Sequence, residues 1–390
     1  MAGMSETTGA SPIGISAERL KALIDTDEPF TLVDTRDDES FEGWRIAGAV
    51  QFFYKPFHEF DPDAFAAEIG LERDDPIVTI CAKGKASRYL ADELVAAGFD
   101  DVRHVADGMR AWSAVYDTAT VETDGSAEIV QLQRRAKGCL GYLVCDPRSG
   151  KAAAIDPTRH VETYLEAADE RGWTIERVLD THVHADHISG GRTLADELGV
   201  PYHLGERVAE RDVGFDYEPL SRNEVLEVGD VELKAVFTPG HTSGMASYLV
   251  GSEAFLTGDT VFVDSVGRTE LQFGDADAAV GAELLYESLH GTVLAEPDPI
   301  TVLPGHFSVP DDGEYGIDPG SEISTTIREL RTTVPILARD RGTFVERILE
   351  TAPEKPPNYE RIIAINRGRA AADGDEAIEL ELGPNRCAAE

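Results

Sequence analysis

The stretch THVHADHISGG, residues 181–191, constrains this chain more than any other feature of its sequence. It places three of the chain's ten histidines and one aspartate within six positions, directly before a glycine pair. Histidine is the commonest metal ligand near neutral pH. The residues just before it, 175-IERVLDTH-182, read as a short strand bounded by polar residues. The pattern therefore predicts a metal site at the end of a strand.

Three further strand-like segments end in a histidine or an aspartate beside a glycine. They supply His241 in TPGHTSG, Asp259 in LTGDT and His306 in LPGH. Loops held by a rigid sheet often carry catalytic groups, and a neighbouring glycine permits a tight turn. A lone histidine at a strand end is usually an ordinary polar residue. Four loops that each deliver such a side chain instead favour one shared metal centre.

The order of apolar and polar segments predicts two domains. A chain of 390 residues is longer than one domain usually is. Residues 1–13 are small and polar, and we expect a disordered tail. Residues 14–117 alternate strand and helix signals, which is typical of an α/β domain with a parallel sheet. Residues 118–127 are polar and contain Gly-Ser, which indicates a linker or an edge segment at the domain boundary. We expect residues 128–390 to form a second, strand-rich domain with a C-terminal extension.

The composition of the chain limits which binding partners and which cellular compartment we expect. The chain has 73 acidic and 35 basic residues, a net charge of −38, which argues against nucleic acid and anionic membranes as partners. Only eight of the basic residues are lysines, and this favours a halophilic protein whose self-repulsion is screened by concentrated salt. An ordinary acidic enzyme is the alternative. With no CxxC pair, no apolar span and no secretory signal pattern, we expect a cytoplasmic location.

The order THVHADH, GH, GD and GH resembles the metallo-β-lactamase superfamily, whose fold is an αββα sandwich with metal at one sheet edge. The flanking sequences 181–191, 238–244 and 257–275 resemble the persulfide dioxygenases, also called sulfur dioxygenases. This resemblance covers roughly residues 128–370 and implies oxidation of a low-molecular-weight thiol persulfide by O₂ to sulfite and thiol.

The resemblance also implies a ligand set. His182, His241 and Asp259 would hold one Fe(II) per chain and leave open positions for sulfur and O₂. Other residues would orient these ligands, shuttle protons as catalytic groups or hold a second metal, namely His184, Asp186, His187 and His306. The same seven residues suit an alternative, a thioester hydrolase of glyoxalase II type with two zinc ions bridged by Asp259. Both alternatives remain open at this point.

The substrate contacts depart from the family pattern. Arg268, in 267-GRT-269, matches an arginine that binds glutathione in the family and would bind the substrate here. Ser308 stands where a tyrosine is expected, and Ile336 stands where a second arginine is expected, with Tyr315 as a replacement for the tyrosine. These changes remove a hydrogen bond and a charge partner for a carboxylate. We therefore expect a carrier thiol smaller than glutathione.

The first domain carries a second resemblance, to the rhodanese family. The segments 32–50, 78–99 and 107–112 carry it, over about residues 15–116. It implies that Cys81 bears a persulfide in a loop whose backbone N–H groups point inward at a helix start. The loop residues that would bind the transferred sulfur are Lys83, Gly84 and Lys85.

Sulfur transfer by this domain is one of two alternatives. Ala86 occupies the position of the family's arginine, so a non-catalytic sensing or docking role is also open. Sulfite and a Cys81 persulfide together could give thiosulfate. The remaining cysteines, Cys139, Cys145 and Cys387, are interpreted as packing or tail residues. The sequence leaves a monomer and a homodimer equally open.

Overall fold

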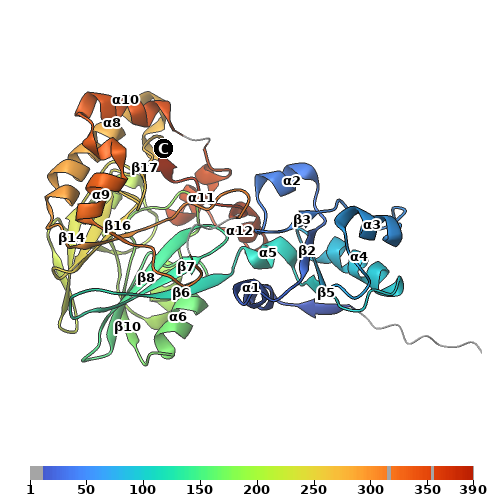
Figure 1. Cartoon of the computed structure of the whole chain (residues 1–390). Helices are drawn as coiled ribbons and strands as arrows, with labels where there is room; N and C mark the ends of the chain where they lie inside the picture. Colours follow the sequence, from blue (N-terminus) through green and yellow to red (C-terminus); the bar gives the residue numbers. More distant parts are fainter. Residues whose placement is uncertain (1–11, 314–317, 353–354, 390) are drawn as a thin grey trace, which may run out of the picture. The chain divides into compact units, whose positions relative to one another are not determined.

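The computed structural model describes residues 12–313, 318–352 and 355–389, apart from the side chain of Asp275 (Figure 1). The chain divides into two compact units, Met1–Val115 with Val309–Gly316, and Tyr116–Ser308 with Ile317–Glu390. Most of the predicted tail and Tyr315 lie outside the described residues. Ile13, the last residue assigned to the tail, begins the first strand.

The first unit contains a parallel sheet with the strand order β1-β5-β4-β2-β3. Its strands are β1 (Ile13–Ile15), β2 (Thr31–Asp34), β3 (Val50–Gln51), β4 (Ile77–Ile80) and β5 (Val102–Val105). Its helices are α1 (Ala17–Asp25), α2 (Asp38–Gly43), α3 (Pro62–Ile69), α4 (Lys85–Ala96) and α5 (Gly108–Trp112). Every residue of β4 is buried, as expected for a central parallel strand covered on both faces.

The second unit contains two mixed sheets. The first has the order β12-β11-β10-β9-β8-β7-β6, and the second has the order β13-β14-β15-β16-β18-β19. The strands of the first sheet are β6 (Tyr116–Val121), β7 (Glu128–Arg134), β8 (Cys139–Asp146), β9 (Lys151–Ile155), β10 (Thr174–Leu179), β11 (Tyr202–Gly205) and β12 (Glu218–Leu220). Those of the second are β13 (Val225–Val228), β14 (Val231–Phe237), β15 (Ala246–Val250), β16 (Ala254–Gly258), β18 (Thr301–Pro304) and β19 (Thr325–Thr326). A separate ladder joins β17 (Val266–Gly267) to β20 (Ala388–Ala389).

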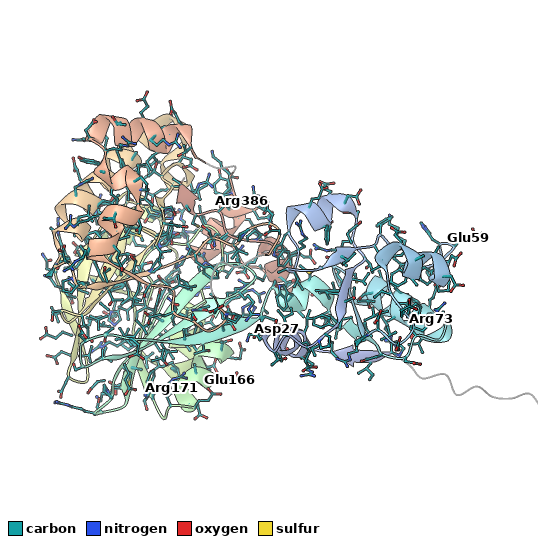
Figure 2. All side chains as sticks on the ribbon, viewed as in Figure 1. Asp27, Glu59, Arg73, Glu166, Arg171 and Arg386 are labelled. Carbon is teal, nitrogen blue, oxygen red and sulfur yellow. The ribbon has the colours of Figure 1, made fainter. Side chains whose placement is uncertain are left out.

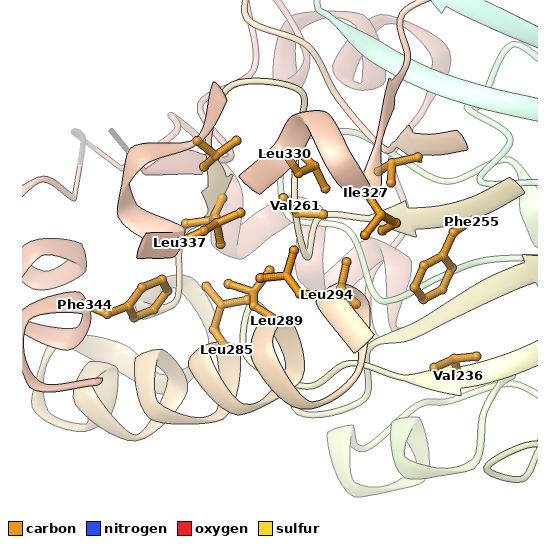
Figure 3. Packing of buried hydrophobic residues seen from close by; sticks show 14 of the residues in the cluster. Val236, Phe255, Val261, Leu285, Leu289, Leu294, Ile327, Leu330, Leu337 and Phe344 are labelled. Atoms are coloured by element: carbon orange, nitrogen blue, oxygen red, sulfur yellow. The ribbon is translucent and has the colours of Figure 1, made fainter. Parts of the chain in front are cut away.

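Helices cover the outer face of each sheet. On the first sheet lie α6 (Val161–Asp169) and α7 (Gly191–Leu198), whose apolar residues share one core cluster with the strands. On the second lie α8 (Glu270–Gly291), α9 (Ile327–Thr333) and α10 (Arg341–Glu350), which pack around a second cluster (Figure 3). The short helices are η1 (Glu206–Arg211), η2 (Val293–Ala295), η3 (Pro335–Ala338), α11 (Tyr359–Asn366) and α12 (Gly374–Leu380). This confirms the predicted α/β architecture and its αββα layers.

The structure decides between a linker and an edge segment for the first part of residues 118–127. Residues 118–121 belong to the edge strand β6 and pair with β7. Ala119 and Val121 are buried, whereas Thr118 and Thr120 are exposed. Small and β-branched residues that alternate in this way form an edge strand, although their composition is polar.

The strand ends of the second unit converge on one edge of the sandwich. The Tyr248 hydroxyl on β15 donates a hydrogen bond of 2.9 Å to the carbonyl of Asp180, just after β10. The Ala246 N–H donates to the Thr181 carbonyl at 2.9 Å. These bonds join the two sheets where their polar loops begin. None of the described helices combines the length and the apolar character needed to cross a membrane.

Candidate metal centre

Three of the predicted ligands come together from three strand ends. His182 follows β10, His241 follows β14, and Asp259 follows β16. Their ligand atoms all lie within 4.8 Å of one another, and all three side chains are buried. Nε2 of His182 is 3.8 Å from Oδ2 of Asp259, and Nε2 of His241 is 3.5 Å from the same oxygen. We call these three residues the ligand trio.

Hydrogen bonds fix which ring nitrogen of each histidine faces the trio. Nδ1 of His241 lies 2.7 Å from the carbonyl of Arg268 and must donate, because a carbonyl only accepts. The Thr181 hydroxyl donates to Asp156 at 2.8 Å, so it accepts from Nδ1 of His182 at 2.9 Å. Each histidine therefore presents an Nε2 lone pair to the trio. This is the hydrogen-bonded support that metal-binding imidazoles usually have.

Asp259 supplies the negative charge of the ligand trio. Its Oδ1 lies 2.6 Å from Nδ1 of His306, whereas Oδ2 is buried and has no hydrogen-bond partner among the described residues. Burial raises the pKa of Asp259, but His306, His241 and His182 more than offset this and hold the pKa well below its usual range. A buried carboxylate oxygen without a partner is costly unless a cation meets it. Two neutral imidazoles and one carboxylate fit a divalent metal ion.

Burial also sets the protonation of the two histidines. It lowers the pKa of His182 well below the ordinary value, and the neighbouring His184 adds to this. It likewise lowers the pKa of His241, against the opposing effect of Asp259. Both rings are therefore neutral near pH 7. A neutral ring is the state in which a histidine binds a metal.

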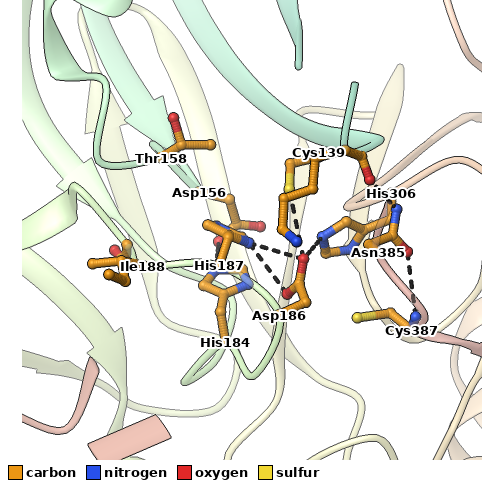
Figure 4. Close-up of polar contacts among 12 residues, drawn as sticks. Cys139, Asp156, Thr158, His184, Asp186, His187, Ile188, His306, Asn385 and Cys387 are labelled. Atoms are coloured by element: carbon orange, nitrogen blue, oxygen red, sulfur yellow. Dashed lines mark hydrogen bonds and ion pairs between the residues drawn. The ribbon is translucent and has the colours of Figure 1, made fainter. Parts of the chain in front are cut away.

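A second cluster lies beside the trio and centres on Asp186 (Figure 4). Asp186 is 2.8 Å from Nε2 of His306 and 3.2 Å from Nδ1 of His187. Burial lowers the pKa of His306, but the carboxylates of Asp186 and Asp259 outweigh it and raise this pKa well above the ordinary value. His306 thus lies between two carboxylates and carries the proton that they share.

Cys139 belongs to this second cluster, although the sequence marked it as a packing residue. Its Sγ lies 3.5 Å from Oδ2 of Asp186. Burial raises the pKa of this thiol, but the neighbouring His187 outweighs it, so the pKa is lowered to about 7. An isolated antiparallel β-bridge pairs the backbones of Cys139 and His306 and holds the two residues side by side. No local motif signals this contact, because it depends on two strands that are distant in sequence.

His184 does not join the ligand trio. Its Nε2 lies 3.2 Å from Oδ1 of Asp156, and it groups with Asp156 and Asp180. The centroid of its ring lies 4.1 Å from that of His182 and 4.3 Å from that of His187. Asp186, His187 and His306 form a group with Cys139.

Residues far along the chain hold the ligand loop in place. The Asn366 side chain donates to the carbonyls of His184 and His187, at 2.9 and 2.8 Å. Oε1 of Glu381 accepts from the N–H of Ile188 at 2.6 Å. No motif surrounds Asn366 or Glu381, so the sequence alone does not mark either residue.

The segment Asn385–Ala389 lies against the centre. It includes Cys387, whose Sγ lies within 4.8 Å of ligand atoms of Asp259 and His306. Arg268, predicted to bind the substrate, is fully buried, forms an ion pair with Glu270 and donates to the carbonyl of Arg386 at 2.8 Å. Its guanidinium therefore contacts groups of its own chain.

The other two positions of the glutathione pattern lie away from the ligand groups. Ser308 is exposed, and Ile336 is partly buried against the core of α8 and α10. Ile336 lines a cavity of about 570 Å³ together with Arg339, Arg347 and Ala389. The cavity is therefore bounded by two arginines and by the strand that contains Ala389.

In the first unit, Cys81 lies at the end of β4, buried, with Lys83 and Lys85 exposed beside it. The Ser87 hydroxyl donates to its Sγ at 3.4 Å. Gly108 allows the loop to close, because a Cβ there would lie 1.9 Å from the carbonyl oxygen of Cys81. Gly84 has a φ of +72° and caps helix α4. The structure thus places the cysteine, the glycine and the two lysines in one loop.

Comparisons with known proteins agree with this architecture. Residues 16–115 match the model of the rhodanese-like domain, and residues 134–306 match that of the metallo-beta-lactamase superfamily. The beta-lactamase hydrolase-like protein of Xylella fastidiosa strain 9a5c is 30% identical over 235 residues, which are 53% of this chain and 52% of that protein. The chain thus spans about half the length of that relative. The hydroxyacylglutathione hydrolase of Mesorhizobium japonicum is 30% identical over 218 residues, 55% of this chain and 80% of that protein.

Two crystal structures are also similar. ETHE1 from Myxococcus xanthus is 26% identical with a TM-score of 0.53, and the match covers 62% of this chain and 98% of that one. A metallo-beta-lactamase from Staphylococcus aureus subsp. aureus COL is 25% identical with a TM-score of 0.57, over 63% of this chain and 74% of that one. From these matches and from the sandwich with its ligand loops, the chain belongs to the metallo-beta-lactamase superfamily and carries a rhodanese-like domain before its metallo-beta-lactamase domain.

Proposed function

We propose that the second unit oxidises the sulfane sulfur of a low-molecular-weight thiol persulfide with O₂, and releases sulfite and thiol. One Fe(II) per chain would be held by the ligand trio, His182, His241 and Asp259. The rhodanese-like unit would transfer sulfane sulfur through Cys81. The motifs 181–191, 238–244 and 257–275 and the likeness to ETHE1 from Myxococcus xanthus support this proposal.

The observation that carries the proposal is the use of the two oxygens of Asp259. Oδ2 points to both histidines of the trio, whereas Oδ1 lies 2.6 Å from Nδ1 of His306. A carboxylate that bridges two metals through both of its oxygens would have no oxygen left for such a bond. The contact between Asp259 and His306 therefore favours one metal with two histidines and one carboxylate, which leaves coordination positions open.

A bound iron would supply the site at which the persulfide sulfur and O₂ exchange electrons. The protein's own groups orient the ligands and move protons. Conversion of the outer sulfur to sulfite consumes a water molecule and releases protons. Asp186, His306 and Asp259 form a buried chain of contacts of 2.8 and 2.6 Å that can hold and pass them on. The Cys139 thiol contacts the same chain.

The names of the curated relatives favour a second candidate function. Proteins of Mesorhizobium japonicum and Polaromonas sp. named hydroxyacylglutathione hydrolase match 80% and 88% of their own lengths. Under this candidate, two zinc ions would activate water for thioester hydrolysis, and Asp186, His187 and His306 would hold the second zinc. The ligand atoms of these three residues lie within 4.8 Å of one another.

Metal content and O₂ uptake separate the two candidates. The full chain is purified without oxygen and assayed in molar KCl with cysteine persulfide, glutathione persulfide and a hydroxyacylglutathione thioester. We expect one iron per chain, O₂ uptake with sulfite release, and faster turnover of the smaller persulfide. Two zinc ions per chain, thioester hydrolysis and no O₂ uptake would replace the proposal with the hydrolase.

Three variants complete this experiment. His241→Ala removes a trio ligand and should abolish iron binding and O₂ uptake together. His58→Ala changes an exposed histidine of the first unit and should alter neither. Cys81→Ser tests the first unit separately, because loss of thiosulfate:cyanide sulfur transfer is expected if Cys81 bears the persulfide. Unchanged transfer in Cys81→Ser would leave a docking role for this unit.

A further inference from the structure

Cys387 lies in the metal centre. Its Sγ, a carboxylate oxygen of Asp259 and a ring nitrogen of His306 lie within 4.8 Å of one another. Figure 4 shows Cys387 and His306 in the same close-up. The side chain is 1% exposed. The nearby Oδ2 of Asp259 is buried and without a hydrogen-bond partner among the described residues. A thiol thus stands beside the group that faces the metal position.

The backbone around Cys387 fixes this placement. Its carbonyl accepts from the N–H of Arg268 at 2.9 Å, and its own N–H donates to Oδ1 of Asn385 at 3.2 Å. The Asn385 amide in turn donates to the carbonyls of Lys137 and Phe307, at 2.7 and 3.1 Å. The next two residues form β20, paired with β17. Bonds from three separate parts of the chain therefore position the thiol.

The same segment occupies the contacts that a diffusible carrier thiol would need. Arg268 is neutralised by Glu270 and bonded to the Arg386 carbonyl, so it is not available for a carrier's carboxylate. Ser308 and Ile336 offer neither the phenol nor the second guanidinium of the glutathione pattern. The groups that bind a carrier thiol in the glutathione pattern are thus either missing or paired within the chain.

We propose that Cys387 carries the sulfur that is oxidised, so that the substrate at the metal is a protein-bound persulfide. This inference rests on the proposed function and deepens it. In the first step, a donor persulfide R–S–SH and the Cys387 thiol exchange sulfur, giving R–SH and Cys387–S–SH with no net redox change. In the second step, Cys387–S–SH, O₂ and H₂O give Cys387–SH, sulfite and two protons. Four electrons pass from sulfur to O₂, and the S–S bond breaks.

The cavity beside β20 offers a binding site for the donor persulfide. Ala389, two residues after Cys387, lines it together with Arg339 and Arg347. Two cationic side chains over an apolar wall suit a small anionic persulfide such as cysteine persulfide. The ladder between β20 and β17 is only two residues long, so the segment opens without breaking either main sheet. The sulfur is then transferred to Cys387 before the segment closes and the persulfide is oxidised.

The test uses the full-length Cys81→Ser chain with iron bound, so that Cys81 takes up no sulfur. The protein is incubated without oxygen with excess cysteine persulfide, desalted, and either alkylated for peptide mass spectrometry or given O₂. We expect one added sulfur atom on the Cys387 peptide and its release as sulfite after O₂. Adding Cys387→Ser should remove the sulfur atom and lower sulfite formation from free cysteine persulfide by about a hundredfold, since the substrate is no longer held in place.

Controls separate this inference from the proposed function. Cys145→Ala removes a buried cysteine of β8 and should leave loading and oxidation unchanged. Asn385→Ala keeps the thiol but loosens its segment, so sulfur loading should persist while sulfite release slows, which tests the inference even if Cys387→Ser fails to fold. Full sulfite formation in the Cys387→Ser chain, or no added sulfur at Cys387, would overturn the inference alone. No sulfite from any of these chains would remove the proposed function and the inference together.

Discussion

Thr181 determines which nitrogen of His182 faces the metal position. Its hydroxyl donates to Asp156 and is therefore left to accept from Nδ1 of His182. An apolar side chain of the same shape would keep the packing but lose this control of the ring. The ring could then turn or carry its proton on Nε2, where the metal must bind.

We therefore expect Thr181→Val to weaken metal binding by about 10- to 100-fold, the usual cost of losing a hydrogen bond behind a ligand. Competition with a chelator, read as metal content at each chelator concentration, measures the change. Thr118→Val alters an exposed threonine of β6 and serves as the control. Equal metal retention in both variants would show that Thr181 does not orient the ligand.

At the residue scale, the sequence predicted those site residues that lie in short, recognisable motifs. His182, His241 and Asp259 each follow a strand beside a glycine, and the structure brings them together. Cys139 and Cys387 were interpreted as packing or tail residues, and the structure places both of these buried cysteines beside the ligand groups. Their place at the centre depends on backbone contacts with distant segments, His306 after β18 for Cys139 and Arg268 after β17 for Cys387. Such contacts leave no local pattern of residues.

At the scale of elements, Glu381 fastens the end of α12 to the metal-ligand loop. Its carboxylate is buried, with one oxygen 3.0 Å from Arg134 and 2.6 Å from Arg159, and the other 2.6 Å from the N–H of Ile188. The Arg134 side chain is fully buried. Through its ion pair with Arg134 and its bond to Ile188, Glu381 joins the end of α12 to β7 and to the ligand loop by charge rather than by apolar packing.

Glu381→Gln should lower the free energy of unfolding by about 3 to 5 kcal/mol, because it leaves the guanidinium of Arg134 buried without its charge partner. Urea unfolding followed by circular dichroism measures this loss. Glu350→Gln, at an exposed position on α10, is the matched control and should stay within about 0.5 kcal/mol of the parent. A similar loss in both variants would contradict the assigned role of Glu381.

The same carboxylate predicts a pH dependence. Burial raises the pKa of Glu381, but Arg134 and Arg159 outweigh it and lower the pKa from 4.5 to about 2. A lowered folded-state pKa contributes stability that is fully present above pH 4.5 and is lost as the pH falls toward 2. The stability difference between the parent and Glu381→Gln should therefore shrink by about 3 kcal/mol over this range. Unfolding free energies at several acidic pH values test it, and a constant difference would refute it.

The sequence also predicted most elements, and the exceptions have a physical reason. Strands such as β4 and β16 are continuous apolar runs and were expected. Residues 118–121 of the edge strand β6 were interpreted as a linker or an edge segment, because their exposed threonines give them a polar composition. The two-residue strands β17 and β20 are too short for any period to be read, and only their pairing defines them.

At the scale of the whole molecule, the excess of acidic side chains is the feature that most affects stability. Acidic side chains such as Asp27, Glu59 and Glu166 are exposed on the surface (Figure 2), and the net charge is −38. Like charges oppose the compact state unless salt screens them. The midpoint of thermal unfolding should rise with KCl up to molar concentrations. A scan at several KCl concentrations tests this, and a flat dependence would indicate an ordinary acidic protein.

The position of Asn385–Ala389 beside Asp259 and His306 also sets an order of events in time. His306 leaves the ribosome well before Cys387 does. Chains grow at roughly 5–20 residues per second, so all the ligand residues are synthesised several seconds before this segment. During that interval the segment that will lie beside Asp259 is still missing. We therefore expect the metal to enter most easily during synthesis, before β20 pairs with β17.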